Sequence, residues 1–381
     1  MIKSLQSRIF LYFRRTSLLV WVLCLLLSSL SLILLSGILD SGYAVSLGIS
    51  KRNLWVQGIS IGLGICSAVA ISLIDYRAMA KAWKFYVPIC YLLLLLTFLI
   101  GVGASGRPED KRWLIIPGIN LSFQPAELLR IAFILIFAYH IHMVQKDIHR
   151  PLCLGGLMVH GAIPVLLLHF QGDDGSALII AVTAICMLFC AEISWKHLLG
   201  GAVFLGASLP ILWFSVLNNF QKQRIMALYD PSAQDIQGFY YQQHRASLAL
   251  ASGGVGGSGI WNAGHTYIPE MHNDFIFSFL GECFGFVGIV ILFIILLCLW
   301  GRIISFAGKA SDTLGQLICI GIFAMLSFQT MLNVGMNISV LPVIGNPLPF
   351  ISCGGSSTLT SYMGIGLVLS VHMHTHHAMF C

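Results

Sequence analysis

Long apolar runs follow one another along almost the whole sequence, and they constrain the fold more than any other feature. A helix that spans a bilayer needs about 20 apolar residues, and ten runs reach roughly this length. The sequence therefore predicts an all-α polytopic membrane protein with about ten transmembrane helices. His160, Pro164 and His169 interrupt the fifth run, so the division between the fifth and sixth helices stays open. We expect the helices at residues 17–37, 54–74, 86–104, 124–144, 153–170, 176–194, 198–218, 274–300, 313–338 and 349–375.

The composition excludes a soluble protein. Only 9% of the 381 residues are charged and 57% are hydrophobic, whereas a soluble domain carries about 25% charged residues. The net charge of +6 comes from basic residues scattered among apolar runs, so we expect no nucleic-acid partner. The eleven cysteines form no CxxC pair, and neither a zinc site nor a disulfide framework is indicated.

The distribution of basic residues predicts the orientation in the membrane. A cytoplasmic N-terminus would place twelve Lys and Arg residues in cytoplasmic segments and eight outside, which agrees with the positive-inside rule. With ten spans the C-terminus is then cytoplasmic as well. We expect one integral membrane domain, 1–381, with a large extracytoplasmic loop at 219–272 between spans seven and eight. Loops of this length are usually functional or disordered, and the aromatic residues of this one favour folding back onto the membrane surface.

A first polar group stands at the start of the fourth span. Gln124 precedes a proline, and Glu127 and Arg130 are three residues apart, so they share a helix face and can pair. Arg112 and Trp113 lie upstream in the connecting loop. Ionisable residues in membrane segments are functional candidates by default. The alternative is a structural salt bridge at the helix start, in which the two residues only neutralise each other's charge.

Two further acidic groups mark the starts of spans six and eight. Asp173 lies in the turn 171–176, where an N-cap is the simplest interpretation. His272 and Asp274 precede span eight, and Glu282 follows eight residues later on nearly the same helix face. Asp274 is another N-cap candidate. For Glu282 the alternative to a functional role is a structural, hydrogen-bonded carboxyl group.

A fourth group occupies the connection between spans nine and ten, residues 333–357. After residue 338 it contains three prolines and three glycines, and Ser352 lies near its end. Non-helical backbone at membrane depth is tolerated only where it is buried in protein or lines a cavity. The pattern therefore predicts a re-entrant, cavity-lining element, and an ordinary tight connection is the alternative.

Together the four groups resemble the motifs of one family. The first group contains R-W-L and then F-Q-P-A-E, followed by a basic residue three positions later. The second group is Q-G-D-D-G-S, and the third is P-E-M-H-N-D-F-I-F followed by E-C-F-G. The fourth group begins with N-V-G-M and ends with P-F-I-S-C-G-G-S. These motifs lie at residues 112–114, 123–130, 171–176, 268–285 and 333–356. Their type and order resemble the SEDS family (shape, elongation, division and sporulation) of peptidoglycan glycosyltransferases over the whole chain, and most closely its RodA branch.

The chain departs from the family patterns without losing a carboxylate. The family usually has Ser, Lys, Gly, Val and Tyr where this chain has Ala126, Arg130, Ser339, Asn346 and Cys353. Arg130 keeps the charge of Lys but not its geometry, so its contacts would differ. Residues 221–224 resemble the RodA branch more than the division branch, FtsW.

The resemblance implies an activity and a location. Members of the family polymerise lipid II into glycan strands, with undecaprenyl diphosphate as the leaving group, and the RodA branch serves cell-wall elongation and cell shape. The implied location is the bacterial inner membrane, with the active site on the extracytoplasmic side. The implied partners are lipid II, the nascent glycan and a class B penicillin-binding protein that supplies transpeptidation. Alternatives are a lipid II flippase, a noncatalytic scaffold for a partner synthase, and the FtsW branch.

We expect Asp274 to act as the general base that deprotonates the attacking sugar hydroxyl. Arg112, Arg130 and either Arg224 or Arg245 would hold diphosphate oxygens, and Glu127 would orient Arg130. A divalent cation, Mg or Mn, would assist by neutralising charge, although the sequence shows no dedicated set of metal ligands. The residues expected to bind substrate are Arg112, Trp113, Gln124, Glu127, Arg130, Asp173, Arg224, Arg245, His272, Glu282 and Ser352.

Overall fold

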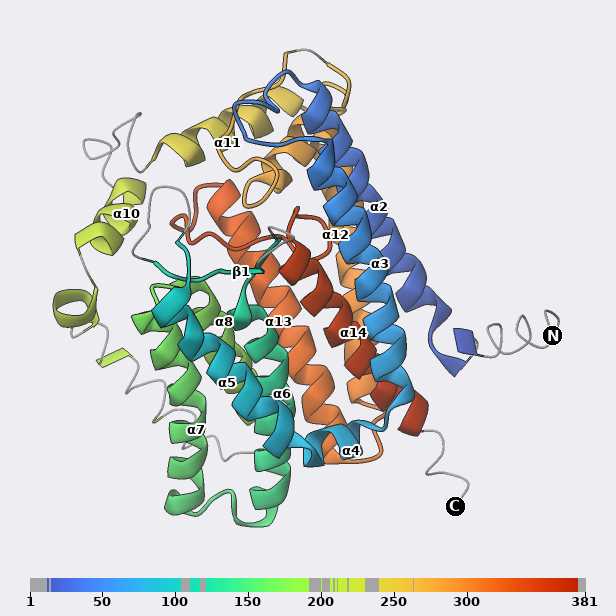
Figure 1. Ribbon diagram of the computed structural model, residues 1–381, viewed down its shortest axis with the longest axis vertical. Coiled ribbons are helices and arrows are strands. Elements are labelled where there is room, and N and C mark those ends of the chain that lie inside the picture. Colours follow the sequence, from blue (N-terminus) through green and yellow to red (C-terminus); the bar gives the residue numbers. More distant parts are fainter. Residues whose placement is uncertain are drawn as a thin grey trace.

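Figure 1 shows a bundle of long helices in a computed structural model of the chain. The structure describes residues 12–13, 15–103, 110–116, 121–191, 200, 206–207, 210, 212–217, 219–229, 240–262 and 264–375. The elements in chain order are α2 (Leu18–Asp40), α3 (Lys51–Leu73), α4 (Tyr76–Lys81), α5 (Trp83–Ile100), β1 (Leu114–Ile116), β2 (Leu121–Phe123), α6 (Pro125–Val144), η1 (Gln145–Asp147), α7 (Pro151–Phe170), α8 (Asp174–Cys190), η2 (Leu212–Val216), α10 (Asn219–Tyr229), α11 (Tyr241–Gly253), α12 (Ile276–Ala307), α13 (Thr313–Asn337) and α14 (Gly355–Thr375).

The long helices coincide with the expected spans. Helices α2, α3 and α5 to α8 occupy the first six, and α12 to α14 occupy the last three. The turn 171–173 divides α7 from α8, which settles the boundary that the sequence left open. About half of expected span 198–218 lies outside the described residues. Seven described helices, α2, α3, α5, α6, α7, α12 and α13, are long and apolar enough to cross a bilayer, so a multi-pass helical fold is confirmed and the total of ten stays a prediction.

A short hairpin corrects the expectation of an all-α fold. Strands β1 and β2 pair antiparallel, with Leu114 opposite Phe123 and Ile116 opposite Leu121. A single bridge between Val102 and Trp113 extends the pairing toward the end of α5. Branched and aromatic residues favour strands, but three-residue strands carry too little periodicity to be recognised between two helices.

Helix α13 lies at the centre of the bundle and packs against α6, α8, α12 and α14. Glycine permits a close approach of α13 to α6, since a Cβ atom on Gly321 would lie 2.7 Å from Ile134 Cγ2. Helices α3 and α14 are equally close, because a Cβ atom on Gly64 would lie 2.6 Å from the ring of Tyr362. Both contacts fix helices that carry polar site residues.

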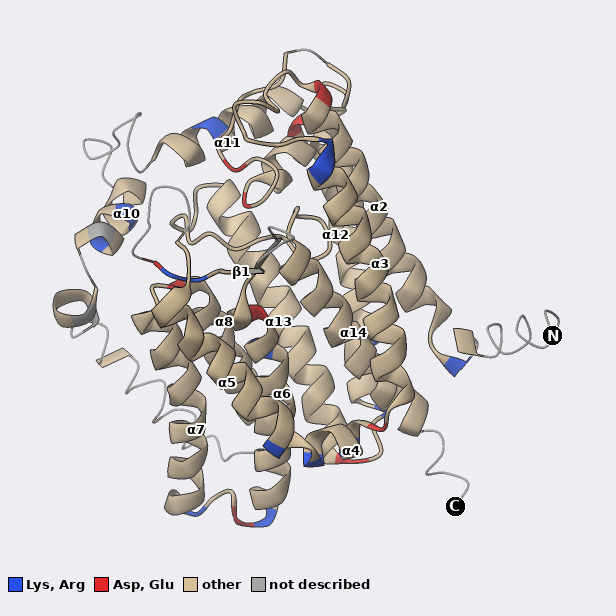
Figure 2. Cartoon of the chain, in the orientation of Figure 1, with Lys and Arg blue, Asp and Glu red and all other residues tan. Residues whose placement is uncertain are grey.

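The two ends of the bundle differ. In Figure 1, α11 and the segments around the start of α12 form the upper end, while α4 and the end of α14 lie at the lower end. Figure 2 shows charged residues at both ends and a further group at mid-height around β1, α8 and α10. Loop 219–272 contains α10 and α11, which the sequence did not predict, and α11 packs on α12 and α13. The location of this loop on the extracytoplasmic side of the membrane stays a prediction.

The backbone between α13 and α14 is irregular, and much of it is buried. Ser339 and Phe350 have positive φ angles, and Leu348, Phe350 and Ile351 are buried. Side chains from other elements satisfy its carbonyl groups: the bonds are Arg224 to Val343, Gln243 to Leu341, Asn333 to Asn346, Gln329 to Pro347 and Gln57 to Ser352. Buried non-helical backbone needs such partners. The segment thus folds into the protein, and its re-entrant, cavity-lining character stays a prediction.

Candidate active site

Asp274 lies directly before α12, where the chain enters the bundle from loop 219–272. Its side chain is partly buried, and its Oδ2 atom lies 3.5 Å from the position that a Cβ atom on residue 345 would occupy. Gly345 has a φ of +73°, a conformation that favours glycine. The N-cap of α12 is Phe275, without a side-chain hydrogen bond to the helix start. The N-cap position of α12 is thus occupied by Phe275 and not by Asp274.

The backbone that carries Asp274 is held from two sides. On one side, Asn333 Nδ2 and Asn337 Nδ2 of α13 each donate to the carbonyl of Asp274 at 2.9 Å. On the other side, Ser352 Oγ donates to the carbonyl of Asn273 at 2.6 Å. Cys353 N adds a bond of 2.9 Å to the carbonyl of His272. The carboxylate thus extends from a backbone that is fixed on both flanks.

Ser352 and His272 both lie beside this backbone. Ser352 also accepts a hydrogen bond from Leu348 N at 2.7 Å, so its hydroxyl ties a turn to residue 273. Burial lowers the pKa of His272, and the nearby carboxylate of Glu270 partly opposes this shift. His272 Nδ1 is buried and has no hydrogen-bond partner among the described residues. Burial thus favours the uncharged form of this ring.

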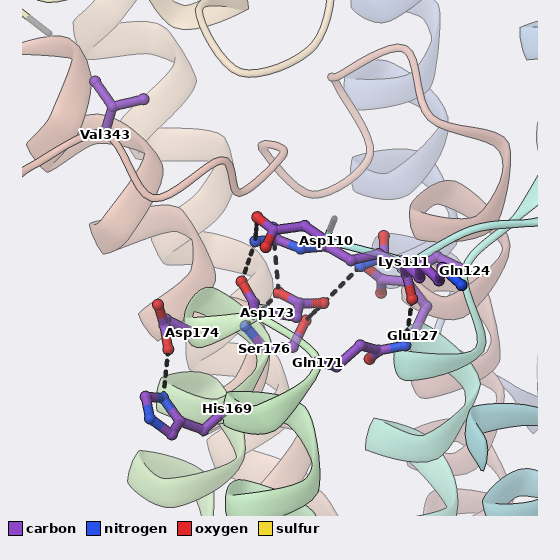
Figure 3. A network of polar contacts seen from close by, with 12 residues as sticks. Asp110, Lys111, Gln124, Glu127, His169, Gln171, Asp173, Asp174, Ser176 and Val343 are labelled. Atoms are coloured by element: carbon purple, nitrogen blue, oxygen red, sulfur yellow. Dashed lines mark hydrogen bonds and ion pairs between the residues drawn. The ribbon is translucent and has the colours of Figure 1, made fainter. Parts of the chain in front are cut away.

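A second polar cluster lies where α6, α8 and the hairpin meet (Figure 3). Asp173 is the N-cap of α8 and accepts from Ser176 N at 3.2 Å, so its predicted capping role is confirmed. Its other oxygen accepts from Ser176 Oγ and from Gln124 Nε2, both at 2.7 Å. Asp173 thereby joins the start of α8 to the start of α6.

Glu127 and Arg130 form the ion pair that their spacing predicts. The Nη1–Oε1 distance is 3.1 Å, and both side chains are almost fully buried. Arg130 Nη2 donates to Ser176 Oγ at 2.6 Å. Arg130 Nη1 also lies 3.5 Å from Gln329 Oε1 of α13. These contacts link α6, α8 and α13, so they fit the alternative of a structural ion pair.

Arg112 reaches the second cluster from the segment before β1. Its Nη2 donates to Asp110 Oδ2 at 2.9 Å and to the carbonyl of Gly172, and its Nη1 lies 4.0 Å from Asp173 Oδ1. Trp113 is partly exposed, and its backbone pairs with Val102. Arg112 therefore combines a bound position with partial exposure, which suits a group that contacts an anionic substrate.

The other predicted basic residues occupy separate places. Arg224 of α10 donates from Nη1 to the carbonyl of Val343 at 2.6 Å, two residues before Gly345. Gln221 on the same helix bonds to Asp174, whose other oxygen pairs with His169 at 2.7 Å. Helix α10 is thus tied both to α8 and to the segment beside Asp274. Arg245 of α11 instead donates to the carbonyl of Tyr267 at 2.8 Å.

Glu282 lies deeper in α12 and serves a different set of partners. Its Oε1 accepts from Thr266 N at 2.8 Å and from Ser252 Oγ at 3.3 Å. Its Oε2 lies 3.4 Å from His265 Nδ1, and both side chains are buried. These contacts fasten α11 and the following loop to α12, which fits the structural alternative for this carboxyl.

Sequence reasoning missed the amide side chains that hold the irregular segment. Gln57, Gln243, Gln329 and Asn337 were not singled out, although each is a polar residue that the structure buries. Isolated amides in apolar helices were the available signal, since buried polar groups need partners. Among the described residues, no group of three or more His, Cys, Asp and Glu side chains is placed to hold a metal ion.

The arrangement suits an acid–base step on an anionic substrate. One carboxylate, Asp274, lies beside a buried backbone segment, and a fixed guanidinium of Arg224 contacts the same segment. Arg112 supplies another cation at the hairpin. A carboxylate can accept a proton when a substrate hydroxyl comes within hydrogen-bonding reach.

Comparison with known proteins gives consistent relatives. The FtsW/RodA/SpoVE family, described as cell cycle proteins, matches residues 15–377. The peptidoglycan glycosyltransferase MrdB of Escherichia coli (strain K12) is 34% identical over 325 residues, which are 82% of this chain and 84% of that protein. The probable peptidoglycan glycosyltransferase FtsW of Geobacter metallireducens is 36% identical over 323 residues, or 83% of each chain.

Solved structures extend the similarity to the fold. A chain from a peptidoglycan synthase complex, described for the structural coordination of polymerization and crosslinking, superposes with a TM-score of 0.76 at 27% identity and covers 93% of this chain and 98% of its own. A mutant of the rod shape determining protein RodA of Thermus thermophilus gives 0.67 at 25% identity, covering 93% and 96%. The resemblance read from the sequence motifs is therefore confirmed, and the chain belongs to the FtsW/RodA/SpoVE family of cell cycle proteins.

Proposed function

We propose that this protein is a peptidoglycan glycosyltransferase that polymerises lipid II into glycan strands during cell-wall elongation. The observation that carries the proposal is the placement of Asp274 beside Gly345, on a backbone fixed by Asn333 and Ser352. The relatives support the same chemistry, because MrdB and FtsW are both named peptidoglycan glycosyltransferases. Identity to the two is similar, so the assignment to elongation rests on the RodA-like residues 221–224.

Asp274 acts as the general base in this proposal. A sugar hydroxyl of one lipid-linked unit attacks the anomeric carbon of the other, and its proton passes to the carboxylate of Asp274. The bond between the anomeric carbon and the diphosphate oxygen breaks, and undecaprenyl diphosphate leaves as an anion. Glycosidases use a second carboxyl group to protonate the leaving oxygen, whereas a diphosphate needs cations more than an acid.

Cationic side chains stabilise the departing diphosphate. Arg112 and Arg224 are suitable because each has a fixed guanidinium that is partly exposed, and guanidinium groups bind phosphate oxygens in bidentate geometry. Arg130 is almost fully buried against Glu127, so it acts through the shape of the cluster. A divalent cation, Mg or Mn, would bind mainly through the substrate diphosphate and would neutralise its charge.

The proposal places the protein in the bacterial inner membrane, with Asp274 on the extracytoplasmic side. Both assignments follow from the distribution of basic residues and from the family. The proposed partner is a class B penicillin-binding protein. A similar solved chain comes from a complex that coordinates polymerization and crosslinking, which supports a partner of this kind.

The test is polymerisation of labelled lipid II by the purified protein, with and without its penicillin-binding partner. Asp274→Asn keeps the size of the side chain and removes the base, so we expect glycan strands from the wild type and none from this variant. Asp147→Asn is the control, because Asp147 is half-exposed between α6 and α7. Full activity of Asp274→Asn would refute the role of Asp274. Translocation of lipid II without polymer would favour the flippase alternative.

A further inference from the structure

Gln57 interrupts the apolar sequence of α3, and its side chain is only 1% exposed. The helix buries a narrow stripe of residues that share one face, and the stripe consists of Gln57, Ile61, Gly64, Ala68 and Ser72. The part of this stripe that is C-terminal to Gln57 packs closely on α14. A buried amide is unfavourable unless it is hydrogen-bonded, so its partners reveal why an amide suits this position.

The Nε2 atom of Gln57 lies between three elements. It is 3.2 Å from Ser31 Oγ of α2, from Thr358 Oγ1 of α14 and from the carbonyl of Ser352. Hydroxyl groups can donate or accept, whereas a carbonyl can only accept. The bond to Ser352 therefore requires that the nitrogen, and not the oxygen, of the amide faces the irregular segment.

Ser352 connects this amide to the backbone of Asp274. Its carbonyl receives the bond from Gln57, and its hydroxyl donates to the carbonyl of Asn273 at 2.6 Å. The adjacent residue, Cys353, donates to the carbonyl of His272 at 2.9 Å. Movement of residues 352–353 would thus move the two residues that precede Asp274.

We propose that Gln57 is a positioning residue for the glycosyl transfer reaction, holding the Ser352 turn and through it the carboxylate of Asp274. This inference rests on the proposed function. Gln57 lies outside the sequence motifs and contacts the reacting groups only through Ser352. Misplacement of a catalytic group by about 1 Å can lower a rate by about 100-fold, so a remote amide can matter for the rate.

The test compares two variants of α3 that each remove a hydrogen bond made by a buried side chain. Gln57→Leu removes the donor with little change in size. Ser72→Ala is the matched control, because Ser72 is buried on the same helix and bonds to Tyr12 OH at 2.7 Å. We expect Gln57→Leu to lower kcat for lipid II polymerisation by about 10-fold to 100-fold with KM nearly unchanged, and Ser72→Ala to keep the wild-type kcat.

A second readout reports on the turn without using activity. Cys353 is a free, partly buried thiol next to Ser352. Its labelling by a water-soluble maleimide, measured on its peptide by mass spectrometry, should become several-fold faster in Gln57→Leu and stay unchanged in Ser72→Ala. Unchanged labelling in Gln57→Leu would show that Gln57 does not hold the Ser352 turn, whatever the activity of the variant.

The combined results separate this inference from the proposed function. If labelling is faster but kcat is unchanged in Gln57→Leu, the positioning role is overturned. The proposed function would still stand if Asp274→Asn makes no polymer. A wild-type protein that makes no polymer with its partner present would overturn both. In the variant Gln57→Leu with Ser352→Ala, we expect a loss of kcat smaller than the product of the single losses, because both act through one turn.

Discussion

Ser352 Oγ donates a hydrogen bond of 2.6 Å to the carbonyl of Asn273, and this bond joins two segments that are 79 residues apart in the sequence. One segment is the irregular connection between α13 and α14, and the other carries Asp274. The position of the carboxylate therefore depends on a part of the chain that contributes no acid or base. Effects of substitution in the connection should appear in the rate of the reaction.

Ser352→Ala tests this dependence directly. The variant loses the bond to Asn273 and the bond from Leu348 N, so we expect kcat for lipid II polymerisation to fall by about 10-fold or more. Stability should fall by about 1–3 kcal/mol, because a buried donor loses its partner. Ser36→Ala on α2 is the control, because Ser36 is partly exposed and its hydroxyl bonds to Ile33 of its own helix, and it should match the wild type. An unchanged kcat in Ser352→Ala would separate the turn from the reaction.

Gly345 offers a test of the space beside the carboxylate. In Gly345→Ala, the new Cβ atom would lie 3.5 Å from Asp274 Oδ2, at a φ of +73°. Gly42→Ala is the matched control, because Gly42 has a φ of +82° and no atom within 4 Å of its Cβ position. Both variants should lose about 1 kcal/mol of stability through backbone strain. Only Gly345→Ala should lower kcat, and equal activities would show that this side of Asp274 is not used.

The helices could be predicted from the sequence because each is a long apolar run. Predicted span 313–338 and observed α13 (Thr313–Asn337) agree within a residue, since the length of an apolar run defines a membrane helix. Capping by Asp173 and pairing of Glu127 with Arg130 were also predictable, because both depend on residues three apart in the chain.

Contacts between distant residues could not be predicted in this way. Gln57 and Ser352 are 295 residues apart, and Arg130 and Gln329 are 199 apart. A single sequence fixes neither the rotation of a helix about its axis nor the path of irregular backbone. Glu282 illustrates the limit. Its separation of eight residues from Asp274 suggested that the two share a helix face, whereas its carboxylate bonds to Ser252 and Thr266.

The ion pair of Glu127 and Arg130 gives a prediction about stability. Arg130→Leu leaves a buried carboxylate without its cation, so we expect a loss of about 3–5 kcal/mol. Arg130→Leu combined with Glu127→Gln removes the unpaired charge and should recover part of this loss. The measurement is thermal unfolding in detergent. Arg150→Leu is the control, because its pair with Asp147 is exposed and contributes little. Equal losses in Arg130→Leu and Arg150→Leu would contradict a role for the buried pair.

His272 gives a prediction about pH. Burial lowers the pKa of His272 below the ordinary value of 6.5, and Glu270 partly opposes this. Between the folded pKa and 6.5, the unfolded chain binds more protons, so stability contributed by this residue falls as the pH decreases through that window and levels off below it. We expect His272→Asn to flatten the pH dependence of the melting temperature below about pH 6.5 relative to the wild type.

Glu270→Gln separates the two causes of this shift. The variant removes the carboxylate that favours the charged ring, so the pKa of His272 should fall further and the loss of stability should extend to lower pH. Gln at this position can still accept the bond that Asn273 Nδ2 donates to Glu270 at 2.8 Å, which keeps the local turn comparable. Melting curves of the wild type, Glu270→Gln and His272→Asn between pH 7.5 and 5 provide the measurement. A pH dependence of Glu270→Gln that ends at the same pH as in the wild type would show that the carboxylate does not act on this ring.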